Sequence, residues 1–499
     1  MKIILTTLNS RYTHSSIGLR YLYANLKELR EDTSILEFSI NDAIQSVAEN
    51  ILMNAPDIVG IGVYIWNASE VRNLIHIIKK VSPKTKIILG GPEVTYEPFR
   101  VNFDSADFII QGEGDTAFYN LCKNIMHSTF LENKIIKMTS PVLKEIELPY
   151  QYYTDEDIKN RYIYVELSRG CPFECEFCLS SMDEKVRAFN LDKVLEEFEI
   201  LWQRGARNFK FVDRTFNLNM RTANRILDFF LEKKEQYFAH FEVIPDHFPT
   251  SLREKISKFP HGALQLEIGI QTLNPEIAKN ISRQLLLDKI EENISYLENE
   301  TEAHIHLDLI VGLPGESLES FGKNLDELVR LSSCEIQIGI LKKLSGTHIG
   351  RHDKEFEMVY SDIPPYDILK NSQFSFNDIQ IMKRFARFWD LLYNSGNFKT
   401  SIDLVWQDES VFENFYKLSL WIYKQTNSTW MISLQRLGEL LFIYLSEVKT
   451  ISKAMIAQKM LDDMMKIKGR AVPAYLKVYA VDFIANSKAG TSGFNKRQN

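Results

Sequence analysis

The chain has 499 residues, of which 45% are apolar and 25% are charged, and its formal net charge is −7. This length predicts two to four domains, and the composition is that of a soluble globular protein. The negative net charge argues against a surface that coats nucleic acid.

Cysteine usage and the lengths of the apolar segments indicate the cellular compartment of the protein. Three of the five cysteines fall between Cys171 and Cys178, whereas a secreted disulfide scaffold would spread its cysteines in pairs. The apolar start, Met1–Leu8, is too short for a signal peptide. The most apolar later window, Ile58–Trp66, has about half the length of a membrane span. We therefore expect a cytoplasmic protein without a membrane segment.

The first part of the chain alternates between strand and helix patterns. Apolar runs predict strands at Lys2–Leu8, Ser34–Ile40, Asp57–Tyr64, Lys86–Leu89 and Phe108–Gln111. Helical spacing predicts helices at Ser16–Leu29, Ala43–Met53 and Ser69–Val81. This alternation is typical of a Rossmann-like, doubly wound α/β sheet. We assign it to residues 1–135 and expect a linker at residues 136–160, where prolines and tyrosines interrupt the rhythm.

A second alternating series follows the linker. Its predicted strands are Tyr162–Ser168, Asn208–Asp213, His240–Ile244, Leu264–Ile268, Ile305–Ile310 and Glu335–Leu341. Its predicted helices are Leu191–Gln203, Arg221–Lys233, Leu252–Phe259, Leu285–Leu297 and Leu318–Leu331. Six strand–helix units of this kind predict an open partial (β/α)6 barrel at residues 161–345.

The remaining residues, 346–499, lack alternating strands and predict a mostly helical C-terminal domain. Its tryptophans are expected in the helix core rather than on a substrate platform; they are Trp389, Trp406, Trp421 and Trp430. The tail at residues 488–499 predicts disorder.

Cys171, Cys175 and Cys178 come directly after the first strand of the second series. Thiolates bind iron–sulfur clusters, and a cubane cluster ordinarily takes four of them. Three thiolates leave one iron free to activate another molecule, as catalytic metal sites keep an open position. A structural zinc site completed by a distant histidine is the alternative. The position at the carboxyl end of a barrel strand favours catalysis.

The spacing Cys-x3-Cys-x2-Cys, with Phe177 before the last cysteine, resembles the signature of the radical SAM superfamily. The resemblance implies a [4Fe–4S] cluster whose free iron chelates S-adenosylmethionine (SAM). Reductive cleavage of SAM then releases a 5′-deoxyadenosyl radical.

The same resemblance implies SAM contacts at later strand ends. Asp213 matches the position of a contact to the methionine amine. Glu267 and Gln271 match the ribose-contacting region and can hydrogen-bond to hydroxyls. Gly312 belongs to a glycine-rich loop on the adenine side, and Arg283 to a segment common in these enzymes. The alternative for Glu267 and Gln271 is a polar pair that lines the barrel only for structure. The alternative for Arg283 is an ordinary surface arginine.

Three loops of the N-terminal domain lie where doubly wound folds bind ligands, beyond the carboxyl ends of the strands. They comprise residues 9–18, 64–69 and 90–95, and a Gly-Glu-Gly-acid segment begins at Gly112. Paired glycines permit the close approach of a ligand to the backbone. The order of these loops resembles radical SAM enzymes that carry a cobalamin-binding domain. The resemblance implies cobalamin contacts by Ser10, Arg11, His14, Tyr64, Trp66, Gly90, Gly91, Pro92, Glu93, Gly112 and Glu113. A flavodoxin-like domain with another ligand, or none, is the alternative.

One motif departs from the cobalamin pattern. The cobalt-ligating motif is Asp-x-His-x-x-Gly, whereas this chain has Tyr12-x-His14-x-x-x-Gly18. The aspartate that would orient the imidazole is absent, and such partners normally fix a metal-binding histidine. We therefore expect cobalamin to bind without cobalt ligation by His14.

The family resemblance implies a cobalamin-dependent methyltransferase that acts on an unactivated carbon of a small-molecule or peptide substrate. A flavodoxin- or ferredoxin-type protein would supply electrons, and a nucleic-acid partner is not expected. A cobalamin-dependent radical cyclase, oxidase or rearrangement enzyme without methyl transfer is the alternative. An RNA methylthiotransferase would need three further cysteines in the N-terminal domain, where only Cys122 occurs. A non-catalytic cobalamin sensor would have no use for the open-iron motif.

Overall fold

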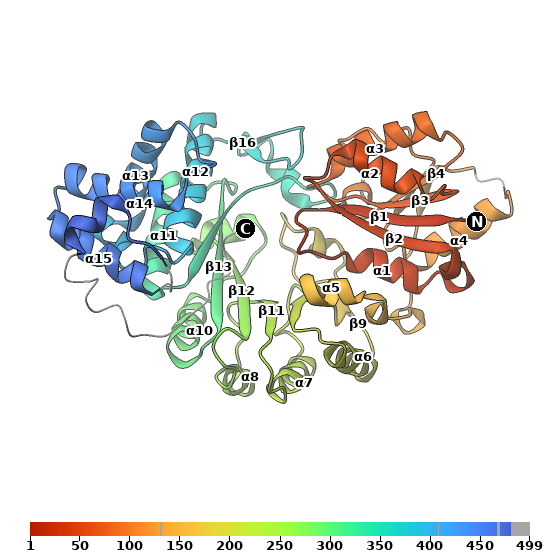
Figure 1. The fold of residues 1–499 in the computed structure, drawn as a ribbon, viewed down its shortest axis with the longest axis horizontal. Helices are drawn as coiled ribbons and strands as arrows, with labels where there is room; N and C mark the ends of the chain where they lie inside the picture. The colour runs from red at the N-terminus through yellow and green to blue at the C-terminus, as the bar shows by residue number, and fades with distance from the viewer. Residues whose placement is uncertain (130–131, 408, 467–469, 481–499) are drawn as a thin grey trace. The chain divides into compact units, whose positions relative to one another are not determined.

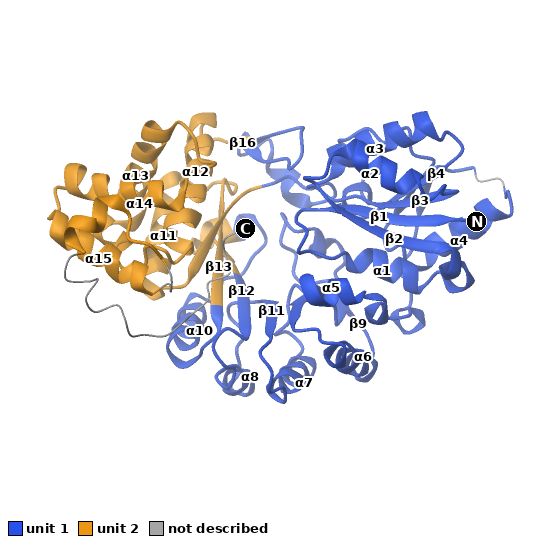
Figure 2. Cartoon of the chain, in the orientation of Figure 1, with its two compact units in different colours: residues 1–268, 279–304, 342–368 blue, residues 269–278, 305–341, 369–499 orange. Residues whose placement is uncertain are grey.

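The computed structural model describes residues 1–129, 132–407, 409–466 and 470–480 (Figure 1). The chain divides into two compact units, coloured separately in Figure 2. Unit 1 comprises residues 1–268, 279–304 and 342–368, and unit 2 comprises residues 269–278, 305–341 and 369–499. The tail at residues 488–499, predicted to be disordered, lies outside the described residues.

Unit 1 begins with a six-stranded parallel sheet in the order β2-β1-β3-β4-β5-β6. Its strands are β1 (Ile3–Asn9), β2 (Thr33–Ser39), β3 (Ile58–Gly62), β4 (Lys86–Gly90), β5 (Phe108–Gln111) and β6 (Ile135–Lys137). Its helices are α1 (Ile17–Ala24), α2 (Ile44–Leu52), α3 (Ala68–Val81) and α4 (Asp115–Met126). The chain runs outward from β1 to β2 and returns past β1 to β3, so the predicted doubly wound topology is confirmed.

Helices cover both faces of this sheet (Figure 1). Ile4 and Leu8 of β1 pack against α2 and α3, whereas Ile3 and Leu5 pack against α1 and α4. Successive strand residues point to opposite faces. A nearly continuous apolar run is therefore what a strand buried on both faces requires.

The helix predicted at Ser16–Leu29 is shorter in the structure. Ser16 caps α1 by accepting a hydrogen bond from the Leu19 amide at 3.3 Å, and α1 ends at Ala24. A few residues later Lys27 has a left-handed φ of 51°, a conformation that an α-helix cannot continue.

The segment predicted as a linker, residues 136–160, contains regular structure. Strand β6 pairs with β5 at the edge of the sheet. Helix α5 (Asp155–Asn160) begins with a capping box between Thr154 and Asp157. The domain boundaries themselves stay a prediction.

Six further strands follow one another in chain order, β7-β10-β11-β12-β13-β14. They are β7 (Ile163–Val165), β10 (Asn208–Phe211), β11 (Phe238–Val243), β12 (Leu264–Gln271), β13 (His304–Val311) and β14 (Glu335–Ile340). The helices are α6 (Leu191–Gln203), α7 (Met220–Leu231), α8 (Thr250–Ile256), α9 (Pro275–Asn280), α10 (Leu287–Glu300) and α11 (Leu318–Leu331). Each predicted strand and helix of this series is present, and α9 is an additional helix that was not foreseen.

Aromatic packing fixes which face of the unit 1 strands meets the helices. Phe209 and Phe211 of β10 contact the rings of Phe198 in α6 and Phe230 in α7. Because side chains alternate along a strand, Lys210 between them points to the opposite, helix-free face.

The C-terminal part of unit 2 is mainly helical, as predicted, with α12 (Phe376–Trp389), α13 (Val411–Thr426), α14 (Leu434–Ile443) and α15 (Lys453–Met465). Two short strands, β15 (Val359–Tyr360) and β16 (Ile368–Lys370), precede it along the chain. Trp389 and Trp406 are buried, but Trp430 is 68% exposed, so its prediction as a core residue is wrong. Its ring instead lies under the guanidinium of Arg387, 4.7 Å from the centroid. Within the described ranges, no helix is both long and apolar enough to cross a membrane.

Candidate functional site

The three motif cysteines lie in a loop that a short hairpin closes. Strands β8 (Ser168–Arg169) and β9 (Arg187–Ala188) pair antiparallel on either side of it. Gly170 leads into the loop with a left-handed φ of 92°, and a Cβ there would lie 2.5 Å from the Lys185 carbonyl oxygen. Glycine is therefore required immediately before Cys171.

Backbone hydrogen bonds hold the loop in one conformation. The Cys171 amide donates to the Asp183 carbonyl at 2.9 Å. The Ser181 hydroxyl donates to the carbonyls of Cys175 and Cys178 at 3.0 and 2.7 Å. These bonds use backbone groups and the Ser181 hydroxyl, and none of them involves a cysteine sulfur.

The three motif thiols lie near one another. Burial raises the pKa of Cys171 and of Cys175, and the thiols of Cys175 and Cys178 raise that of Cys171 further. The three thiols are therefore close enough to interact. Three thiolates without a fourth suit a cluster that keeps one iron open to another molecule.

Charged partners surround the loop in unit 1. Arg283 donates to Cys175 Sγ at 3.8 Å, so it contacts the motif directly. Glu176 is buried and accepts hydrogen bonds from Ser282 at 2.6 Å, Arg351 Nε at 2.8 Å and His352 at 2.9 Å. The side chain between two cysteines thus anchors the loop to two distant segments. Phe177 is half-buried next to it.

Two predicted SAM contacts in unit 1 have protein partners. Asp213 accepts from the Leu167 amide at 2.9 Å and the Ser168 hydroxyl at 2.7 Å, and burial raises its pKa to about 7. Glu267 is 3.0 Å from His240 Nε2. Asp213 therefore stabilises the backbone ahead of the cysteine loop. The SAM contacts predicted for Asp213 and Glu267 stay predictions.

The other two predicted SAM contacts belong to unit 2. Gln271 ends β12 with a left-handed φ of 63°, and its buried Oε1 has no partner among the described residues. A strained strand end with an unsatisfied amide is often a ligand site. Gly312 follows β13 with φ 90°, and its carbonyl accepts from Asn371 at 3.2 Å.

The N-terminal sheet carries a cavity of about 220 Å³ at the carboxyl ends of its strands. It is lined by Gly18, Leu19, Tyr21, Leu22, Gly60, Ile61, Gly62, Tyr64, Ile88, Leu89, Gly90, Gly91, Ile110, Gly112, Glu113, Gly114, Asp115, Phe118 and Arg169. A Cβ at Gly90 would meet no atom within 4 Å, so the space before it is open. The position and the glycine lining suit the narrow tail of a cofactor that enters between strand ends.

Five of the residues predicted to contact cobalamin line this cavity: Tyr64, Gly90, Gly91, Gly112 and Glu113. The other six do not line it: Ser10, Arg11, His14, Trp66, Pro92 and Glu93.

Two of those outside the cavity have informative surroundings. Trp66 is 42% exposed and stacks on Tyr64 with ring centroids 4.5 Å apart. Glu93 is buried and accepts a short hydrogen bond from the Tyr366 hydroxyl. The exposed ring of Trp66 offers a flat surface, whereas Glu93 is occupied by a protein partner.

His14 faces the second strand series of unit 1. Its Nδ1 lies 2.5 Å from the Tyr164 hydroxyl. Burial lowers the pKa of His14, and the positive charges of Lys210 and Arg11 lower it further. The expectation that His14 does not ligate cobalt rests on the motif departure and stays a prediction.

Some cavity residues were not singled out from the sequence. Gly60 and Gly62 lie inside the apolar strand β3, where glycine is a known signal of close approach. A Cβ at Gly60 would lie 2.7 Å from the Phe118 ring. Asp115 and Arg169 are 54 residues apart, and no sequence spacing links them.

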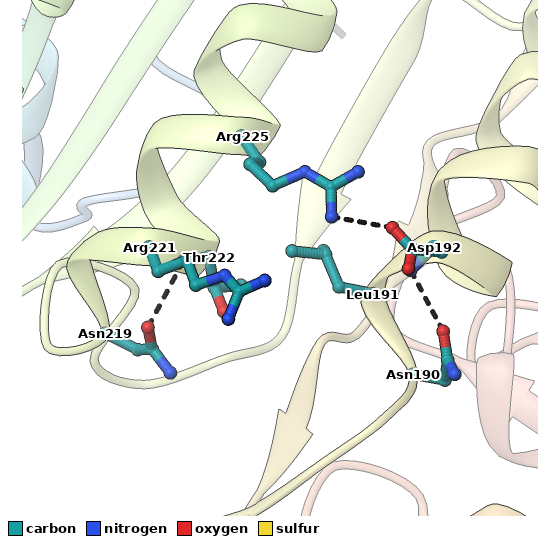
Figure 3. Close-up of a pocket in the computed structure, with 7 residues that line it drawn as sticks. All are labelled: Asn190, Leu191, Asp192, Asn219, Arg221, Thr222 and Arg225. Atoms are coloured by element: carbon teal, nitrogen blue, oxygen red, sulfur yellow. Dashed lines mark hydrogen bonds and ion pairs between the residues drawn. The ribbon is translucent and has the colours of Figure 1, made fainter.

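A second hollow, of about 330 Å³, lies between the N-termini of α6 and α7 (Figure 3). Asn190 and Asn219 cap these helices by accepting backbone hydrogen bonds, and Arg225 pairs with Asp192 at 2.6 Å. Both asparagines and the Arg225–Asp192 pair thus have partners within these two helix starts.

Three family models match successive parts of the chain. "B12 binding domain" matches residues 3–122, "Radical SAM superfamily" matches residues 165–328, and "Protein of unknown function (DUF4080)" matches residues 354–488. The first contains every residue that lines the cavity except Arg169, and the second contains the cysteine loop.

Two curated proteins are similar in sequence. Uncharacterized methyltransferase PH0819 of Pyrococcus horikoshii is 25% identical over 367 residues, 68% of this chain and 78% of that protein. The 2-(S-pantetheinyl)-carbapenam-3-carboxylate methyltransferase of Streptantibioticus cattleyicolor is 23% identical over 333 residues, 59% of this chain. The match spans 47% of the length of the second protein.

Two solved structures share the fold. TsrM from Kitasatospora setae, with cobalamin and a [4Fe-4S] cluster bound, has a TM-score of 0.58 and 15% identity, covering 70% of this chain and 74% of that one. OxsB with aqua-cobalamin bound has a TM-score of 0.61 and 14% identity, covering 96% and 84%. With its B12-binding and radical SAM domains, the chain belongs to the cobalamin-binding radical SAM enzymes, whose cofactors are a [4Fe–4S] cluster, S-adenosylmethionine and cobalamin.

Proposed function

We propose that this protein is a cobalamin-dependent radical SAM methyltransferase that methylates an unactivated carbon of a small-molecule or peptide substrate. The observation that carries the proposal is the occurrence, in one compact unit, of the three-thiol loop and the glycine-lined cavity. When bound, the cluster supplies an electron to SAM and cobalamin carries the methyl group. The methyltransferase names of two relatives add support.

Each part of the chain has a role in this proposal. Cys171, Cys175 and Cys178 hold the cluster, and the hairpin strands β8 and β9 keep them together. The contacts to SAM come from Phe177, Asp213, Glu267, Gln271, Arg283 and Gly312. The cavity receives the cobalamin tail at Gly90, and the exposed face of Trp66 lies toward the corrin.

The proposal also includes the domain division and the partners. Residues 1–135 bind cobalamin, residues 161–345 hold the cluster and SAM, and residues 346–499 form the C-terminal helical domain. Electrons come from a flavodoxin- or ferredoxin-type protein in the cytoplasm.

An anaerobic assay with the full-length, reconstituted protein tests the proposal. Candidate substrates are incubated with SAM and a reductant, and 5′-deoxyadenosine, S-adenosylhomocysteine and methylated product are measured together. Methyl transfer predicts that all three appear in fixed proportion. Deoxyadenosine with a modified substrate, but without S-adenosylhomocysteine, would instead support a cobalamin-dependent cyclase, oxidase or rearrangement enzyme.

A further inference from the structure

Arg169 lies at the junction of the cavity and the cysteine loop. Its side chain lines the cavity, and its backbone is two residues ahead of Cys171. The guanidinium donates to Glu113 at 2.5 Å, to both carboxylate oxygens of Asp115 at 2.7 and 3.1 Å, and to Glu166 at 3.0 Å. Three carboxylates therefore fix the orientation of one arginine.

The carboxylates on the cavity side come from a rigid loop. Glu113 and Asp115 follow β5 and open α4, and both line the cavity. Gly112 between β5 and this loop has a left-handed φ of 89°. A Cβ at Gly114 would lie 3.2 Å from Leu22. A ligand in the cavity therefore touches the loop that holds Arg169.

Two short routes lead from this loop to the first cysteine. The first runs along the backbone from Arg169 to Cys171 through Gly170, whose left-handed φ of 92° suits glycine. The second runs from Glu113 to Arg187, which also binds the Asp183 carboxylate at 2.7 Å.

The second route ends at the same residue as the first. The Asp183 carbonyl accepts the hydrogen bond of the Cys171 amide at 2.9 Å. Both routes therefore converge on Cys171.

Arginine suits this junction because of its shape. Its planar fork binds carboxylates bidentately, whereas lysine presents one compact charge that cannot bridge three groups in fixed directions. The Arg169 guanidinium also lies 4.7 Å from the centroid of the Tyr21 ring, another residue that lines the cavity. Its position is therefore set from several sides.

We propose that Arg169 is a positioning residue that couples cobalamin binding in the cavity to assembly of the cluster at the cysteine loop. The proposal rests on the proposed function and adds a regulatory link between its two sites. An ordered loop at residues 112–115 holds Cys171 in place for the cluster. Coupling between binding sites is reciprocal, so an assembled cluster must strengthen cobalamin binding by the same factor.

Cobalamin affinity measured in two states of the full chain tests this coupling. Hydroxocobalamin is titrated into protein with a reconstituted cluster and into protein stripped of iron, and the two Kd values are compared. We expect the wild type to bind at least about fivefold tighter with the cluster. In Arg169→Lys the ratio should fall to about one, because the charge is retained but the bridging fork is lost.

A matched control changes an arginine away from both sites. Arg204 binds the carbonyls of Gln151 and Tyr153 and the carboxylate of Asp155, so Arg204→Lys should keep the wild-type ratio. Glu113→Gln provides a second test of the junction if Arg169→Lys does not fold, and should also lower the ratio.

The outcomes separate this coupling from the proposed function. A wild-type ratio of one, or an undiminished ratio in both junction variants, would overturn the coupling while cobalamin binding still stands. If cobalamin binds neither the protein with a cluster nor the protein stripped of iron, the coupling and the proposed function are both overturned.

Discussion

Gly90 offers the cleanest way to block the proposed cobalamin cavity. It ends β4, lines the cavity, and a Cβ there would meet no atom within 4 Å. Its neighbour Gly91 cannot serve, because its φ is 109° and a Cβ would lie 2.6 Å from the Val63 carbonyl oxygen. Gly90→Phe should therefore fill the cavity with little effect on the fold.

The expected loss of affinity follows from the atoms displaced. The phenylalanine side chain brings about seven carbon atoms into a cavity of about 220 Å³. At about 0.3 kcal/mol for each ligand atom displaced, binding weakens by about 2 kcal/mol. This corresponds to a roughly 30-fold higher Kd.

Equilibrium titration of the full-length protein with hydroxocobalamin measures this change. Asn73→Phe is the matched control, because Asn73 is exposed on α3 and does not line the cavity. Thermal unfolding of both variants checks that the fold is retained. An unchanged Kd in a folded Gly90→Phe protein would show that cobalamin binds elsewhere, and the argument from the glycine lining would fail.

Three further predictions concern other parts of the chain. Gly170→Ala should lower the iron bound after reconstitution, whereas Gly205→Ala should not. Gly205 shares a left-handed backbone, with φ 100°, but has nothing within 4 Å of its Cβ position; equal iron contents would refute this steric account. Burial raises the pKa of Glu316 to about 8, so the folded protein keeps a proton that the unfolded chain releases near pH 4.5. Wild-type stability should consequently fall, by up to about 1.4 kcal/mol per pH unit, as pH rises from about 4.5 to about 8, and this contribution should level off above that range. The fall, measured by chemical denaturation, should be shallower in Glu316→Gln than in the wild type, and parallel curves for the two proteins would contradict this assignment. His14→Ala should retain cobalamin, and the cobalt(II) paramagnetic spectrum of both proteins should lack axial nitrogen splitting. Splitting that disappears only in the variant would identify His14 as a ligand.

The sequence predicted much of the fold because its strands are buried in regular patterns. In β1 every residue is buried, so the apolar run at the start of the chain indicates a central strand. Helices α6 and α11 have the predicted bounds, since each begins after a polar N-cap, Asn190 or Ser317, and has a clear apolar face.

Other features depend on contacts between distant residues and could not be predicted. The Trp430 ring lies under the Arg387 guanidinium because the segment between α13 and α14 contacts α12, and an apolar residue type alone does not show burial. Strand β6 has three residues, too few for a periodic pattern.

In the candidate site, too, local sequence predicts some features and contacts between distant residues decide others. The three cysteines are close in sequence, so their spacing predicts their chemistry directly. Glu93 and Asp213 were predicted as cofactor contacts from local motifs, yet their carboxylates accept hydrogen bonds from Tyr366 and Ser168. Such partners lie 273 and 45 residues away, and only the folded chain reveals them.

The central claim, that the cysteine loop binds a cluster that cleaves SAM, is tested most directly by replacing Cys171, Cys175 and Cys178 together with alanine. Iron, sulfide and 5′-deoxyadenosine formation are then measured anaerobically beside the wild type. We predict that the wild type holds about four irons and four sulfides per chain and forms deoxyadenosine. The triple variant should lose all three signals while still binding cobalamin. Iron and SAM cleavage retained in the triple variant would contradict the claim, as would stoichiometric zinc without iron or sulfide in the wild type.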